Sequence, residues 1–161
     1  RIAARGLAMV PEGRRLFPSL TVEENLLAGR HLGRAGHWDL PRVYELFPIV
    51  LEKREQRART LSGGERRLVG LGRGLMREGK ILLIDEPSLG LAPVMIDTVY
   101  SAIKAIVEAD RTVLLIEENF THIGDVADEV HVLESGTIVR SGSLEALMND
   151  RTVVETYLGT L

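Results

Sequence analysis

The stretch "ILLIDEP", Ile81 to Pro87, decides how the rest of the chain is interpreted. Its first four residues are apolar without a polar alternation, which is typical of a β-strand buried on both faces. Asp85 and Glu86 follow at the carboxyl end of this strand, the edge at which α/β proteins bind ligands. An aspartate there can hold the Mg²⁺ of a nucleotide, and a neighbouring glutamate can accept a proton from an attacking water. A buried strand that ends in two solvated acids has the same pattern, so this stretch alone leaves the function open.

Two further apolar stretches indicate the fold class. "GLAMV", Gly6 to Val10, and "TVLLI", Thr112 to Ile116, also read as buried strands. A helix is predicted from Pro93, with apolar residues at helical spacing that comprise Ile96, Val99, Tyr100, Ile103 and Val107. Strands without a polar face, separated by helices, predict an α/β fold with a parallel sheet covered by helices on both faces.

The remaining segments are assigned around this sheet. Residues 14–76 are polar and helical in pattern and too long for a simple crossover, so we predict a helical subdomain inserted into the chain. Residues 1–13 and 77–142 then form the α/β core, which includes a hairpin over 129–140. Residues 143–161 are predicted to form short C-terminal helices.

The stretch "LSGGE", Leu61 to Glu65, has two interpretations that build on each other. Ser62 and Glu65 have the spacing of a capping box, and apolar residues follow on one helical face at Leu68, Leu71 and Leu75. A helix start is therefore predicted here. The N-terminus of a helix also carries unpaired N–H groups and a partial positive charge. Gly63 and Gly64 would leave that backbone open to a phosphate, although a plain helix cap explains the same residues.

Composition limits the class of protein. The 161 residues are 45% hydrophobic, enough for the core of one domain, and the net charge of −3 does not suggest a nucleic-acid surface. The chain has no cysteine, which excludes disulfides and thiolate metal sites. No apolar run approaches the ~18 residues of a membrane span, and we expect a soluble, cytoplasmic protein. Because the sequence opens at Arg1 without methionine, we also expect it to be a piece of a longer protein.

The motifs occur in the order found in one family. "LSGGE" resembles the signature motif of ABC-type ATPases, and "ILLIDEP" resembles their Walker B strand with its catalytic glutamate. "SLGLAP", Ser88 to Pro93, is similar to their D-loop, and "VPEGRRLFPSLTVEENL", Val10 to Leu26, to their Q-loop and the segment after it. The resemblance covers essentially the whole chain. It is greatest to the ATP-binding subunits of bacterial branched-chain amino-acid importers, as in "VYELFPIV", "DEPSLGLAP", "LLIEENF" and "YLG".

This resemblance implies a fold and a function. The fold would be a parallel P-loop NTPase (RecA-like) core with an inserted helical subdomain, its N-terminal part missing. Two ATPase subunits, identical or different, would face each other, and the complete protein would hydrolyse ATP with Mg²⁺ to drive import across the bacterial inner membrane. The chain would lie at the cytoplasmic face, bound to transmembrane permease subunits and to no nucleic acid. Leu16 and Phe17 would be candidates for the permease contact.

The resemblance also assigns site residues. Glu86 and Glu118 are the catalytic candidates, and Asp85 and Glu12 are the metal candidates. Glu12 is also a candidate for nucleotide binding, together with the signature residues Ser62, Gly63, Gly64 and Glu65. Through these signature residues the helix N-terminus would meet the γ-phosphate of the partner's ATP.

The chain departs from the family pattern in a motif that its 161 residues do not contain. The phosphate loop G-x-x-x-x-G-K-[ST] is expected upstream of Arg1, and without it we expect residues 1–161 to be inactive. "GLMREGK", Gly74 to Lys80, fits only part of the motif, because Ile81 stands where Ser or Thr should bind Mg²⁺. This segment also precedes a strand instead of following one.

Three departures concern residues that are present. Glu118 stands where the family has histidine or glutamine, and a carboxylate about 4 Å from a phosphate charge is repelled by roughly 4 kcal/mol at a dielectric of about 20. Glu118 is therefore expected to be protonated, to be turned away, or to impair hydrolysis. Glu12 replaces the usual Q-loop glutamine, as in the importer subgroup. Arg66 and Arg67 replace polar amides, and either face a phosphate or are solvated.

Two alternatives to a branched-chain amino-acid importer remain at this point. The same ATPase could drive a urea or short-amide importer, because substrate choice lies in other subunits. A non-hydrolytic regulatory domain is the second alternative, favoured by Glu118 and disfavoured by the intact Asp85 and Glu86.

Overall fold

The computed structural model describes residues 6–12, 16–30, 38–77, 79–109, 111–118, 122–124 and 126–158. The chain divides into two compact units, Arg1–Glu117 and Glu118–Leu161. Each unit is described by itself below.

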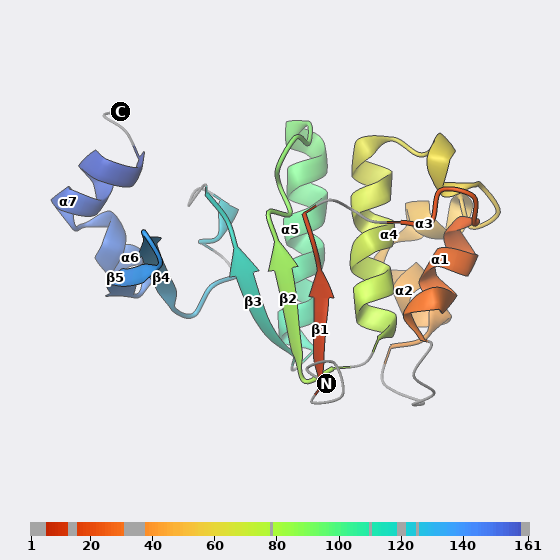
Figure 1. Cartoon of the computed structure of the whole chain (residues 1–161), viewed down its shortest axis with the longest axis horizontal. Helices are drawn as coiled ribbons and strands as arrows, with labels where there is room; N and C mark the ends of the chain where they lie inside the picture. Colours follow the sequence, from red (N-terminus) through yellow and green to blue (C-terminus); the bar gives the residue numbers. More distant parts are fainter. Residues whose placement is uncertain are drawn as a thin grey trace. The chain divides into compact units, whose positions relative to one another are not determined.

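The first unit contains a three-stranded parallel sheet, shown in Figure 1. Its strands are β1 (Leu7–Val10), β2 (Ile81–Asp85) and β3 (Thr112–Ile116), in the spatial order β1-β2-β3. The register pairs Leu7 with Ile81, and at the other end it pairs Asp85 with Ile116. The predicted parallel sheet is therefore confirmed, and its carboxyl edge carries Asp85.

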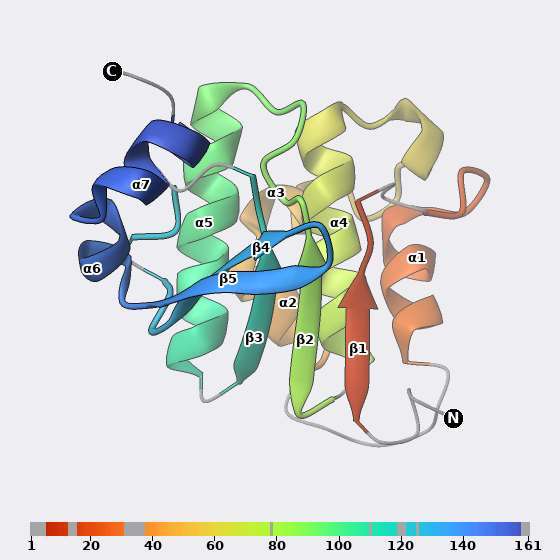
Figure 2. The same cartoon turned by 60° about the vertical axis from the view of Figure 1, so that its left-hand side comes forward.

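The two faces of this sheet differ in burial. Leu82 and Ile84 are fully buried on one side, where α4 and α5 lie in both views (Figures 1 and 2). Side chains alternate between the faces of a strand, and three that alternate with the buried ones remain about half exposed: Met9 (51%), Leu114 (51%) and Ile116 (48%). The expected helical cover is therefore present on one face in the described part of this unit.

The segment between β1 and β2 is helical. It comprises α1 (Val22–Gly29), α2 (Leu40–Leu46), α3 (Pro48–Glu52), a 3₁₀ turn η2 (Ala58–Thr60) and α4 (Gly63–Met76). Local signals fix the starts of these helices: Thr21 and Glu24 form a capping box, Asp39 caps α2, and Pro48 opens α3. A common core holds them together, made by Val22, Leu26, Val43, Phe47, Leu68, Leu71 and Leu75.

Glycines in α4 allow this helix to pack closely on its neighbours. A Cβ at Gly72 would lie 2.8 Å from side-chain carbons of both Leu26 and Val43. A Cβ at Gly74 would lie 2.5 Å from a methyl group of Val10 on β1. Each glycine weakens a helix by roughly 1 kcal/mol relative to alanine, and at these two positions the loss allows the helix to approach α1, α2 and β1.

Helix α5 (Pro93–Glu108) connects β2 to β3 and starts at the proline predicted to open it. Its buried face consists of Val99, Tyr100, Ala102, Ile103 and Ile106. Ile96 and Val107, which were predicted on this face, are half-buried at its margins. The predicted apolar face is therefore confirmed at its centre.

The second unit contains the predicted hairpin, β4 (Val130–Glu134) and β5 (Thr137–Gly142), which pair antiparallel. Ser135 and Gly136 join them, and both have positive φ (48° and 80°), as a type I′ hairpin turn requires. Three short elements follow: α6 (Leu144–Met148), α7 (Arg151–Val153) and the π-helical turn η4 (Val154–Leu158). Across the described ranges of both units, every helix is too short or too polar to span a bilayer.

Candidate functional site

The carboxyl end of β2 places the two predicted acids at the edge of the sheet. Asp85 and Glu86 are both half-buried. Glu86 has φ of 46°, a left-handed conformation that costs a residue with a Cβ roughly 1–2 kcal/mol. Such a conformation persists where surrounding contacts determine it, and it often marks a functional position.

Three hydrogen bonds hold the Glu86 backbone in this conformation. Its N–H donates to the Ile116 carbonyl of β3 at 2.9 Å. Its carbonyl accepts from the Leu89 N–H at 3.4 Å and from the Arg67 guanidinium at 2.7 Å. The direction in which the Glu86 side chain leaves the sheet is therefore set by the neighbouring strand, the following turn and helix α4.

Arg67 differs from both sequence-based interpretations of the arginine pair. Its side chain is only 2% exposed, so it is not a solvated surface residue. Its guanidinium donates to the backbone carbonyls of Glu12 at 3.2 Å and of Glu86 at 2.7 Å. Arg67 therefore lies in the protein interior, where its side chain bonds two backbone carbonyls. The prediction that Arg67 either faces a phosphate or is solvated was wrong.

Glu117 is a residue of this edge that the sequence analysis missed. Its carboxylate accepts hydrogen bonds from the Ser88 N–H and hydroxyl, both at 3.0 Å, and from the Tyr100 hydroxyl at 2.7 Å. Burial raises the pKa of Tyr100 well above its usual value, and the hydrogen bond to Glu117 raises it further. Glu117 thus ties the turn after Glu86 to α5. Its position directly after an apolar strand is the feature of the sequence that could have identified it as a residue of this edge.

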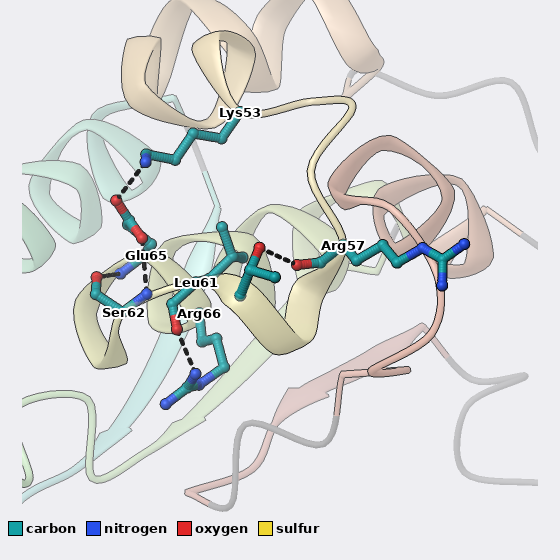
Figure 3. A network of polar contacts seen from close by, with 7 residues as sticks. Lys53, Arg57, Leu61, Ser62, Glu65 and Arg66 are labelled. Carbon is teal, nitrogen blue, oxygen red and sulfur yellow. Dashed lines mark hydrogen bonds and ion pairs between the residues drawn. The ribbon is translucent and has the colours of Figure 1, made fainter.

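The N-terminus of α4 has the predicted capping box, drawn in Figure 3. The Ser62 hydroxyl accepts from the Glu65 N–H at 3.3 Å, and the Glu65 carboxylate accepts from the Ser62 N–H at 2.7 Å. Lys53 adds an ion pair to Glu65 at 3.1 Å. The Arg66 guanidinium donates to the Leu61 carbonyl just before the helix. These contacts fix the start of α4 and occupy the carboxylate of Glu65.

The two signature glycines have different surroundings. Gly63 is half-buried, whereas Gly64 is buried. A Cβ at Gly64 would lie 2.5 Å from the terminal methyl group of Met95 in α5 and 3.2 Å from its sulfur. A side chain at position 64 would therefore require Met95 to move, and the role of both glycines toward a phosphate stays a prediction.

The Glu65 carboxyl should make stability depend on pH. Burial alone would raise its pKa, but the hydrogen bond from the Ser62 N–H and the Lys53 ammonium outweigh burial, so its pKa lies below the usual value. A lowered folded-state pKa stabilises the fold above the unfolded-state value, about 4.3, and this stabilisation is lost as the pH falls through the folded-state pKa. We expect Glu65→Gln, which keeps the cap but not the charge, to unfold at lower urea concentration at pH 7.

The difference between Glu65→Gln and the parent should shrink between about pH 5 and pH 3. Glu55→Gln is the matched control, because the Glu55 side chain is 85% exposed. The urea midpoints of all three proteins are measured across this pH range. A difference between Glu65→Gln and the parent that stays constant with pH would contradict the charge effect.

The loop before α1 presents an aromatic side chain. Phe17 is 51% exposed and the Arg73 guanidinium lies 5.7 Å from its ring centroid, within the range of a cation–π contact. Leu16, the other candidate for the permease contact, is half-buried. Asn25 is fully buried below this loop and holds it through the Phe17 N–H at 2.8 Å, the Phe17 carbonyl at 3.1 Å and the Thr21 carbonyl at 2.8 Å.

The structure therefore brings together some of the predicted site residues. The Glu12 and Glu86 backbones share the Arg67 guanidinium, and Asp85 precedes Glu86 at the same sheet edge. Glu118 is the first residue of the second unit, and its catalytic role stays a prediction. Among the described residues, no group of three His, Cys, Asp or Glu side chains is arranged to hold a metal by itself.

Comparison with known proteins gives consistent results. A family model described as "ABC transporter" matches residues 1–89. The chain is 43% identical over 160 residues to the high-affinity branched-chain amino acid transport ATP-binding protein BraG of Pseudomonas aeruginosa, covering 98% of the chain and 69% of the relative. It is 31% identical to the lipopolysaccharide export system ATP-binding protein LptB of Haemophilus influenzae, covering 98% of the chain and 67% of the relative.

A solved structure shares the fold. The ADP conformation of MJ1267, an ATP-binding cassette of an ABC transporter, superimposes with a TM-score of 0.78 at 24% identity. The match covers 99% of this chain and 70% of that chain.

Proposed function

Because the chain belongs to the ABC transporter family, as an ATP-binding cassette, we propose that it hydrolyses ATP in the complete protein to drive import of branched-chain amino acids. The observation that carries the hydrolysis is the Glu86 backbone, which three hydrogen bonds hold in a left-handed conformation at the carboxyl edge of the sheet. The 43% identity to BraG supports the amino-acid importer over the urea importer and the regulatory domain.

The proposed chemistry assigns each acid one task. Glu86 takes a proton from a water molecule as the water oxygen bonds to the γ-phosphorus of ATP, and the bond to the bridging oxygen breaks so that ADP leaves. Asp85 and Glu12 supply hard carboxylate oxygens, the donors that Mg²⁺ prefers, and need phosphate oxygens and water to complete its coordination. An Mg²⁺ ion held there would neutralise charge on the phosphates.

The α4 N-terminus is proposed to act on a second subunit's nucleotide. Ser62 and Gly63 lie at a helix end whose N–H groups favour an anion. Glu65 would act indirectly, since its carboxylate is bonded to Ser62 and Lys53 and keeps this end in place. Phe17, half exposed on a loop held by Asn25, is the proposed contact to a permease subunit at the cytoplasmic face of the membrane.

Uptake by cells tests the transported substrate. In a strain whose gene for the full-length protein is deleted, we expect uptake of radiolabelled leucine, isoleucine and valine to fall. The parent gene should restore this uptake and Glu86→Gln should not. Unchanged amino-acid uptake together with lost urea or acetamide uptake would assign the same ATPase to the short-amide alternative.

Glu118→Gln is expected to speed ATP hydrolysis by the full-length protein at neutral pH. The resemblance to ABC-type ATPases implies that position 118 acts at the γ-phosphate, where an amide would keep the shape of the side chain and remove its negative charge. Rates of both proteins from about pH 5.5 to pH 8.5 measure this, and a variant slower at every pH would make Glu118 a working part of the site.

A further inference from the structure

Helix α4 carries a buried side chain that joins two distant segments of the proposed site. We propose that Arg67 is a positioning residue for ATP hydrolysis: it holds the backbone of Glu86, and with it the proton-accepting carboxylate, in register with the segment of Glu12. This proposal rests on the proposed function, in which Glu86 accepts the proton.

The contacts of Arg67 favour positioning over direct catalysis. The two hydrogen bonds that define the link end on backbone carbonyls, that of Glu12 55 residues away in sequence and that of Glu86 19 residues away. The side chain is 2% exposed, so it lies in the interior of the first unit. Arg67 therefore determines the positions of the Glu12 and Glu86 segments.

The guanidinium suits this task for a geometric reason. Its N–H groups lie in one rigid plane, so two carbonyls bonded to different nitrogens are held at a set separation and angle. Nη1 bonds the Glu12 carbonyl and Nη2 the Glu86 carbonyl. A lysine ammonium is a single point on a flexible stem and cannot impose that geometry. Of the two hydrogen bonds that the Glu86 carbonyl accepts, the one from Arg67 is the shorter, at 2.7 Å against 3.4 Å from Leu89.

A second buried arginine provides a matched control. Arg111 is 7% exposed and donates to the carbonyl of Leu75, at the other end of α4. It precedes β3 and therefore lies at the amino edge of the sheet, away from Glu86. Replacing Arg111 tests what the loss of a buried arginine does to the fold without moving the proposed site.

The experiment compares Arg67→Gln, Arg67→Lys and Arg111→Gln in the full-length protein. We expect both Arg67 variants to lower kcat for ATP hydrolysis by roughly 10- to 100-fold with little change in KM, because a small misplacement of a reacting group is costly. Arg111→Gln should lower the urea midpoint without lowering kcat of the folded protein. Circular dichroism identifies any variant that does not fold. If Arg67→Gln unfolds, Arg67→Lys still tests the proposal, because it keeps the positive charge at this position.

A double variant separates this inference from the proposed function. Arg67→Gln combined with Glu86→Gln should be no slower than Glu86→Gln alone, because a positioning residue has no effect once the group it positions is removed. Unchanged kcat in Arg67→Lys, or equal loss of kcat in Arg67→Gln and Arg111→Gln, would overturn the role of Arg67. Normal hydrolysis by Glu86→Gln would overturn the proposed function itself, whatever the Arg67 variants do.

Discussion

Glu86→Gln in the full-length protein is expected to lower the rate of ATP hydrolysis by on the order of 10²–10⁴-fold. The amide keeps the size of the side chain but cannot accept the proton of the attacking water. The backbone at this position should be unaffected, because its three hydrogen bonds involve only the N–H and carbonyl of residue 86. ATP binding should therefore be retained, and the nucleotide should accumulate unhydrolysed on the protein.

Single-turnover hydrolysis and equilibrium binding of ATP together measure this effect. Glu108→Gln is a suitable control, since Glu108 is exposed at the end of α5 and its replacement should leave both quantities unchanged. A Glu86→Gln protein with the parent's rate would show that another group accepts the proton. Lost binding would show that the carboxylate holds the nucleotide or its metal.

Asn25→Ala is expected to reduce the free energy of unfolding by roughly 2–3 kcal/mol. The Asn25 side chain is fully buried and bonds the Phe17 N–H and the carbonyls of Phe17 and Thr21. Truncation leaves the part-buried Phe17 N–H without this acceptor and removes the donors to the two carbonyls, so several net hydrogen-bond contributions are lost together. The loop that presents Phe17 should also lose its fixed position.

Urea unfolding of the full-length protein measures this loss, with Asn149→Ala as the exposed control. Asn25→Asp gives a finer test, because a carboxylate can accept from the Phe17 N–H but cannot donate to the carbonyls. It should also be destabilised relative to the parent. An Asn25→Ala protein as stable as the control would mean that the loop finds other partners for its backbone.

Local sequence patterns predicted the elements that local forces determine. Ser62 and Glu65 were recognised as a helix start because this pair acts over one helical turn. The strand from Ile81 was recognised from a continuous apolar run. Its acids were placed correctly at the sheet edge because they directly follow that run.

The parts that were missed depend on contacts between distant segments. Nothing around Arg67 in the sequence indicates that its guanidinium reaches Glu12, because that contact exists only after α4 has packed against the segment from β1. The bonds between Glu117 and Ser88 likewise require β3 to lie beside β2. The sequence shows only that residues 67 and 117 are charged. The fold shows that the side chains of Arg67 and Glu117 both bond backbone groups of the proposed site.

The pairing of β1 with β2 has a consequence for how the chain folds. All of the helices from α1 to α4 lie between these two strands in the sequence, whereas α5 alone separates β2 from β3. Closing a longer loop costs more conformational entropy before any contact compensates for it, and pairings between distant segments slow folding. Val10 of β1 moreover packs against α4 at Gly74, so β1 can make all of its packing contacts only after that helix has formed. β2 and β3 therefore have the shorter route to pairing, and we expect β1 to join them later in folding, which would bring Glu12 within reach of Arg67 as one of the last steps.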